Sequence, residues 1–161
     1  YAEEIPLIDL AKEYGMLPFE VNVLHVNRTI CEKIMSLVRF SYGEDPLDDL
    51  KKKIRHTYDI HQLLKVPEIK GFFESSDFER MLLLVAKDDT ESFKSNNEWL
   101  MHHPKEALIF SQAEETWKEL EDIYTNEFGN LVHGTLPEGT DVMNSLKLVS
   151  ERIKYITWSI D

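Results

Sequence analysis

The chain has 161 residues, enough for one domain of usual size, and its 42% hydrophobic residues exclude a wholly disordered chain. Its formal net charge of −12 argues against a protein that coats nucleic acid generally, because such binding needs cations that displace counterions. The single cysteine, Cys31, excludes a disulfide within the chain and is typical of a reducing cytoplasm, and no apolar run approaches the roughly 18 residues of a membrane span.

The charge is distributed unevenly. Residues 28–70 contain nine Lys/Arg and seven Asp/Glu, whereas the remaining residues contain nine Lys/Arg and 23 Asp/Glu. A locally cationic segment within an acidic chain indicates a candidate pocket for an anion. The alternative interpretation is a solvated helix face, which is the more common reason for a group of charges.

The first predicted elements are a short helix over residues 3–15 and a strand over residues 17–26. Pro6 suits a first helical turn and Gly15 a helix end. The strand prediction follows from the alternating pattern and the β-branched residues of "LPFEVNVLHV". A lone strand leaves its backbone N–H and C=O groups unpaired, so we expect it to pair with strands outside these 161 residues.

Two helices are predicted after the strand. Thr29 and Glu32 have the spacing of a capping box, which predicts a helix start at this point. Its apolar stripe consists of Ile30, Ile34, Leu37 and Val38. Asp45 as an N-cap and Pro46 as the first helical residue predict a second helix that continues to about Leu64.

The rest of the chain is predicted to be helical, with helices that begin near Pro67 and cover residues 75–89, 112–128 and 140–158. Residues 90–104 are polar and less regular, and residues 129–141 form a loop. The fold class is therefore mainly α, with residues 1–161 forming a single bundle-like domain that has a short strand near its start.

Lys33 and Asp59 are the candidate site residues that follow from the helices themselves. Asp59 lies where the second helix becomes apolar, and a buried carboxylate needs a cation partner. Lys33 and Arg55 are the candidates for that partner. A buried Lys–Asp pair with open space beside it favours a phosphate or ribose site. Arg28 and Lys33 are positioned to flank a phosphate if the first helical turn adds backbone N–H groups.

Two stretches together resemble the nucleotidyl transferase AbiEii/AbiGii toxin family. The first, "VNVLHVNRTICEKI", carries the family's R-T-x-x-E-K pattern from Arg28 to Lys33. The second, "KIRHTYDIHQLL", carries R-H-x-x-D-L from Arg55 to Ile60, with Ile60 in place of the more usual Leu. The resemblance covers residues 19–64. The later helices are consistent with the family but carry no motif of it.

This resemblance implies the C-terminal part of a polymerase-β-like nucleotidyltransferase, which transfers a nucleotide from a nucleoside triphosphate to an acceptor hydroxyl. In the family, a G-S motif and a D-x-D pair hold two Mg²⁺ ions. The resemblance assigns Lys33 as the lysine that faces the phosphates. It assigns Asp59 as the carboxylate that holds Lys33 or contacts the nucleotide, and Arg28 and Arg55 as further phosphate-binding residues.

The sequence departs from the family because it contains no G-S motif followed by D-x-D. The acids of "DPLDDL" follow the lysine motif instead. We therefore expect the metal-binding part to precede Tyr1, and we expect this chain alone to bind no Mg²⁺ or nucleoside triphosphate and to transfer no nucleotide. The expected partners are the N-terminal part of the same polypeptide, an antitoxin protein, and an RNA or protein acceptor.

Two other functions remain open from the sequence. Arg55, His56 and His61 have the residue types of a helical HEPN-type RNase, in which His61 acts as a general base near neutral pH. Alternatively, the chain is a binding module without catalysis, whose acidic C-terminal helices bind a basic partner.

Overall fold

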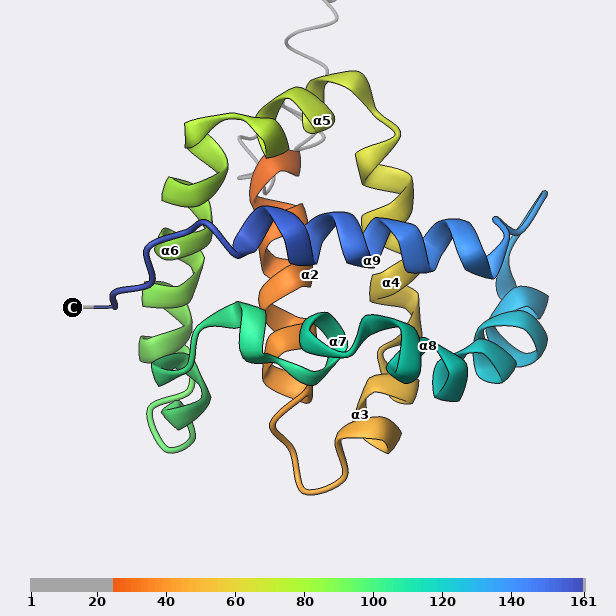
Figure 1. Cartoon of the computed structure of the whole chain (residues 1–161), viewed down its shortest axis with the longest axis horizontal. Coiled ribbons are helices and arrows are strands. Elements are labelled where there is room, and N and C mark those ends of the chain that lie inside the picture. The colour runs from red at the N-terminus through yellow and green to blue at the C-terminus, as the bar shows by residue number, and fades with distance from the viewer. Residues whose placement is uncertain (1–24, 161) are drawn as a thin grey trace, which may run out of the picture.

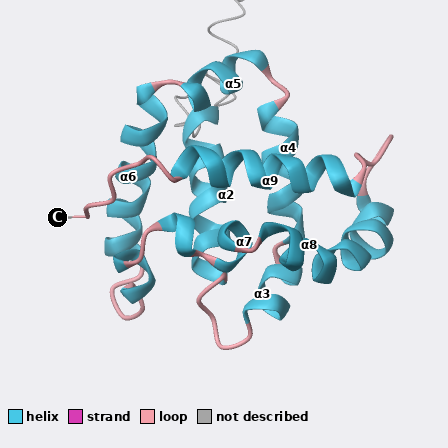
Figure 2. Ribbon diagram, in the orientation of Figure 1, coloured by secondary structure: helices cyan, strands magenta, loops and turns pink. Residues whose placement is uncertain are grey.

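The computed structural model describes residues 25–160, and within this range the chain is mainly helical and contains no strand (Figure 2). The predicted helix over residues 3–15 and most of the predicted strand lie outside the described residues. The strand's predicted end is wrong, because Val26 is the first residue of helix α2 (Val26–Phe40) and His25 is its N-cap.

Three helices run side by side and form the body of the fold (Figure 1). Helix α2 lies between α6 (Ser76–Ser92) and α4 (Ile54–Leu64). Helix α5 (Pro67–Glu74) connects α4 to α6 at one end of the body. Helix α9 (Gly139–Ile153) crosses in front of the body and packs against α4. The mainly α fold class is thereby confirmed.

Shorter elements fill the rest of the fold. Helix α3 (Pro46–Lys52) precedes α4, and the 3₁₀ turns η1 (Glu98–Met101) and η2 (Pro104–Glu106) follow α6. Helix α7 (Leu108–Ser111) leads to α8 (Ala113–Asp122), which continues as a π-helical turn, η3 (Ile123–Phe128). The 3₁₀ turn η4 (Gly129–Leu131) ends this run.

The core is built on the apolar stripe of α2. Its predicted members are all buried, and Cys31 is buried among them. Burial raises the pKa of the Cys31 thiol to about 12, because a thiolate there would lose its hydration. Cys31 therefore remains protonated at neutral pH and packs as a small hydrophobic side chain, as its position in the stripe predicts.

The start of α2 differs from the predicted capping box. Thr29 lies inside the helix, and its hydroxyl donates to the His25 carbonyl at 3.4 Å. His25 Nδ1 caps the helix by accepting from the Asn27 N–H at 3.2 Å. Glu32 accepts a hydrogen bond from the Arg28 guanidinium rather than from a backbone N–H. Arg28 thus engages the carboxylate that a capping box needs.

The predicted long helix from Pro46 to Leu64 is divided in two. Asp45 caps α3 as predicted, accepting from the Asp48 N–H at 3.2 Å. The helix breaks at Lys53, whose φ of −109° and ψ of 18° are not helical. Both parts contact α2, but α3 also contacts α8, whereas α4 also contacts α9. Leu50 of α3 and Ile60 of α4 are both buried.

The last helix ends at Ile153, five residues before the predicted end at Trp158. The residues beyond it stay attached through side chains instead of helical hydrogen bonds. Ile156 is buried, and the Trp158 indole N–H donates to the Leu100 carbonyl at 2.9 Å. Apolar spacing alone does not distinguish such a packed tail from another helical turn.

No helix among residues 25–160 has the length and apolar character needed to cross a lipid bilayer.

Ser41 joins the end of α2 to the short helix α7. Its buried hydroxyl donates to the Leu37 carbonyl at 2.9 Å and accepts from the Ile109 N–H at 3.3 Å.

We expect Ser41→Ala to lower the free energy of unfolding by about 1–3 kcal/mol, because the Ile109 N–H loses this acceptor. Urea unfolding measures the change. Ser92→Ala, at an exposed serine, is the control and is expected to change stability by less than about 0.5 kcal/mol. Equal changes in the two variants would contradict this role for Ser41.

Candidate functional site

Lys33 and Asp59 meet between α2 and α4. The Lys33 ammonium lies 2.7 Å from Asp59 Oδ2, and the two side chains are 22% and 21% exposed. The residues are 26 positions apart, so the contact depends on the packing of the two helices. The structure therefore brings together the two residues that sequence reasoning paired. Partial exposure leaves both charges in reach of solvent and of a ligand.

The ion pair lies on the side of α4 that faces away from α9. His61, two residues after Asp59, points toward α9, where its Nδ1 lies 2.7 Å from the Ser145 hydroxyl. Residues two apart on a helix point about 160° away from each other. Asp59 therefore projects from the opposite side, and α9 does not cover the pair.

Arg55 borders the ion pair but is not tightly bound to it. Its Nε lies 3.8 Å from Asp59 Oδ2, which is beyond hydrogen-bond distance, and its side chain is 78% exposed. A contact of this length on an exposed helix face contributes little to stability. The guanidinium is consequently free to move toward an anion that approaches Lys33.

Arg28 lies away from this site. Its guanidinium donates to Glu32 at 2.9 Å and to Asp88 of α6 at 2.6 Å. These two hydrogen bonds, that to Asp88 first, raise the pKa of Arg28. Arg28 thus fastens α2 to α6, whereas Lys33 faces α4. The structure does not gather Arg28 with the other candidate phosphate-binding residues.

The region around His56 is cationic. Burial first, and then the nearby charges of Lys33 and Lys53, lower the pKa of the His56 imidazole to about 4, against the opposing effect of Asp59. Lys53 is a residue that the sequence reasoning missed as part of the site. Its position at the helix break, where its ammonium lies 4.8 Å from the centre of the Phe40 ring, gives no signal in the sequence.

The carboxylates of the described residues do not gather into a cluster of three metal ligands. Within residues 25–160, no three His, Cys, Asp or Glu side chains lie close enough to hold a metal ion together. The acids of α3 pair with Lys52 instead, since Asp48 lies 2.7 Å and Asp49 3.9 Å from its ammonium. We therefore assign no metal ligand within this range and derive no chemical step through Mg²⁺.

The residues proposed for a HEPN-type RNase do not converge. Arg55 and His61 are six positions apart on α4, so they point about 120° away from each other. His61 is engaged with Ser145, while Arg55 is exposed beside Asp59. Burial, followed by the charge of Lys65, lowers the pKa of His61. No feature of the described structure favours this alternative.

His56 makes stability dependent on pH. The pKa of His56 falls from 6.5 in the unfolded chain to about 4 in the fold, so as the pH falls the unfolded state takes up a proton before the folded state does. The contribution of neutral His56 to the free energy of unfolding is complete above pH 6.5 and is lost as the pH falls toward 4. Asp89, whose pKa burial raises from 3.8 to about 6, acts in the opposite direction.

We therefore expect His56→Gln to lose less stability than the wild type between pH 7 and pH 4. Urea unfolding across this range tests the difference, and parallel curves would argue against it.

Comparison with known proteins identifies the family. The model of the AbiEii family, described as a nucleotidyl transferase AbiEii toxin of a type IV toxin–antitoxin system, matches residues 2–146. No curated protein matches the chain. No solved structure matches it either. The family match covers α2 and α4, which carry Lys33 and Asp59, and extends into α9. The chain belongs to the AbiEii nucleotidyl transferase toxin family.

Proposed function

We propose that Lys33 and Asp59 form the part of a nucleotidyltransferase site that binds the phosphates of a nucleoside triphosphate. The observation that carries this proposal is the 2.7 Å ion pair, half-buried between helices and left uncovered by α9. The family match supplies the reaction class. The neighbouring charges of Lys53 and Arg55 support binding of an anion, because cations outnumber carboxylates around Asp59.

The chemistry assigns a separate role to each residue. In nucleotidyl transfer, an acceptor hydroxyl oxygen bonds to the α-phosphorus, the bond from that phosphorus to the bridging oxygen breaks, and pyrophosphate leaves. The Lys33 ammonium has three N–H donors, and Asp59 accepts from one of them. The remaining donors neutralise charge on the phosphates as it increases in the transition state. Asp59 holds the ammonium in place, so it is a positioning residue.

The ion pair is better suited to this role than to stabilising the fold. Partial burial removes hydration from both charges, and this loss offsets much of their attraction. The net contribution of such a partly buried pair to stability is therefore small. A phosphate that replaces lost water around Lys33 regains that hydration energy, which makes the ammonium a favourable binding group.

The proposal places the metal-holding carboxylates in another segment of the polypeptide. It is supported by the lack of a G-S…D-x-D pattern in the 161 residues. This chain alone then transfers no nucleotide. Incubation with Mg²⁺, each labelled nucleoside triphosphate and candidate RNA or protein acceptors tests that statement. Labelled product above background would refute it. An antitoxin is the partner that the family description implies.

Removing the ammonium is expected to weaken binding of triphosphate. We expect Lys33→Met to reduce the affinity of the full-length protein for nucleoside triphosphates by about 10- to 100-fold, because a charge-assisted hydrogen bond is lost. Titration calorimetry with each of the four nucleotides measures the change. Lys87→Met, at an exposed lysine of α6, is the matched control and should bind as the wild type does. Equal affinities for all three proteins would exclude Lys33 from the site.

The same residue should affect transfer by the full-length protein. We expect Lys33→Met to lower the rate by about 10²- to 10³-fold, the usual effect of removing one group that stabilises transition-state charge. Asp59→Asn should lower it less and Lys87→Met not at all. A full-length Lys33→Met protein with the wild-type rate would contradict the assigned role.

A further inference from the structure

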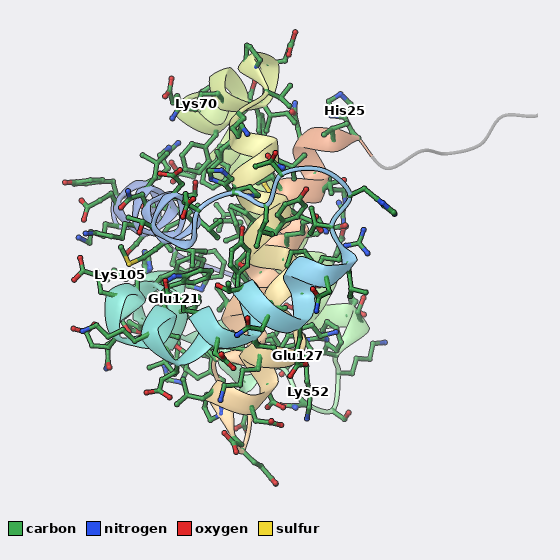
Figure 3. The ribbon with its side chains drawn as sticks, turned by 90° about the vertical axis from the view of Figure 1, so that its right-hand side faces the viewer. His25, Lys52, Lys70, Lys105, Glu121 and Glu127 are labelled. Atoms are coloured by element: carbon green, nitrogen blue, oxygen red, sulfur yellow. The ribbon has the colours of Figure 1, made fainter. Side chains whose placement is uncertain are left out.

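A groove lies where α3 and α4 face the π-helical turn η3. It has a volume of about 800 Å³ and runs between α4 and the π-helical turn η3. This volume is within the usual range for small-molecule sites, about 300–1,000 Å³. Lys52 and Glu127 of η3, which both line the groove, lie close together in the view of Figure 3. The groove is separate from the Lys33–Asp59 contact, although Arg55 borders both.

The floor of the groove is apolar. The Tyr58 and Phe128 rings meet edge to face there, with centroids 5.2 Å apart. The Tyr58 hydroxyl accepts from Gln62 and is therefore already engaged. Leu131 is 76% exposed on the wall, although large apolar side chains usually avoid water. The remaining apolar lining residues are Ile54, Ile123 and Val132.

The rim of the groove is cationic. Lys51, Lys52 and Arg55 line it against the single carboxylate of Glu127. Lys52 is paired with Asp48 at 2.7 Å. Lys51 forms no ion pair with any described residue, and Arg55 has only its 3.8 Å contact with Asp59. Two cations are thus available to a ligand, in a protein whose net charge is −12.

The backbone shapes one wall of the groove. Residues Ile123–Phe128 form a π-helical turn, a wider turn that is rare and is often found at functional sites. Ile123, Glu127 and Phe128 of this turn all line the groove. A continuation of α8 as a regular α-helix would rotate these side chains to other directions. The wider turn therefore helps to create the groove.

We propose that this groove binds a small organic anion that has an apolar body and one anionic head group. The body lies on the Tyr58–Phe128 floor, and the head group binds Arg55 and Lys51. No Asn or Gln side chain lines the groove to read the hydrogen-bonding edge of a particular ring. Apolar area and charge are therefore the main basis of selection, beside the hydrogen-bonding groups of Tyr58, Glu127 and His133. The site shares Arg55 with the phosphate site proposed for Lys33 but contains neither Lys33 nor Asp59.

Titration calorimetry with paired probes tests the ligand class. The charged probes are 1-naphthyl phosphate, with a ring, and laurate below its micelle concentration, with a chain. 1-Naphthol and inorganic phosphate each have only half of the proposed features. We expect at least one charged probe to bind with saturation and at least tenfold more tightly than 1-naphthol or phosphate. Binding of 1-naphthyl phosphate alone, of laurate alone or of both shows whether the groove prefers a ring, an alkyl chain or accepts either as the apolar body. Lack of saturation by either, or equal binding of 1-naphthol, would overturn the proposal.

Matched variants locate the binding. Leu131→Glu places a carboxylate on the wall, and we expect it to weaken binding at least tenfold. Met101→Glu makes the same change at a similarly exposed apolar residue, 81% against 76%, outside the groove and should have no effect. Arg55→Gln should weaken binding, whereas Arg80→Gln, at a similarly exposed arginine of α6, should not.

Circular dichroism confirms that each variant is folded. Equal losses in a groove variant and its control would overturn the assignment. Lys33→Met should leave probe binding unchanged, which separates failure of this proposal from failure of the phosphate site.

Discussion

The ion pair between Lys33 and Asp59 depends on how α4 returns along α2. The break at Lys53 frees α4 from the direction of α3, and α4 then packs beside α2 with Ile60 buried in the core. This packing places an ammonium and a carboxylate 2.7 Å apart at the edge of the core. The cost of removing hydration offsets much of the attraction in this pair, and the exposed part of both side chains keeps the charges accessible. The functional interpretation of the fold follows from that combination.

Helix α4 connects the two proposed sites. Asp59 faces Lys33, whereas Tyr58 lies in the groove beside the π-helical turn. Arg55, on the same helix, borders both. The opposite face of α4 packs on α9, where His61 meets Ser145. One helix of eleven residues thus carries the core contact, the candidate phosphate site and the groove. Its many polar residues are explained by the number of surfaces that it serves.

Local signals in the sequence were sufficient for much of this structure. Helical periodicity predicted the core stripe of α2, Asp45 predicted the start of α3, and the need of a buried carboxylate for a cation paired Asp59 with Lys33. Local sequence signals gave wrong predictions where residues distant in the sequence determine a side chain's partner or the end of a helix. Arg28 is bound by Asp88, sixty positions away, and the break at Lys53 reflects separate packing of α3 and α4. Such competition between partners depends on tertiary contacts that apolar spacing and capping patterns do not describe.

Nitrogen NMR of the lysine ammonium groups tests the central claim most directly. The Lys33 signal, assigned by its loss in Lys33→Met, can be followed while a nucleoside triphosphate is added to the full-length protein. The account predicts that this signal shifts with saturation, and that the Lys87 signal, from an exposed ammonium on α6, does not. A Lys33 signal that stays unchanged, or that moves only as much as that of Lys87, would show that the ammonium does not bind phosphate.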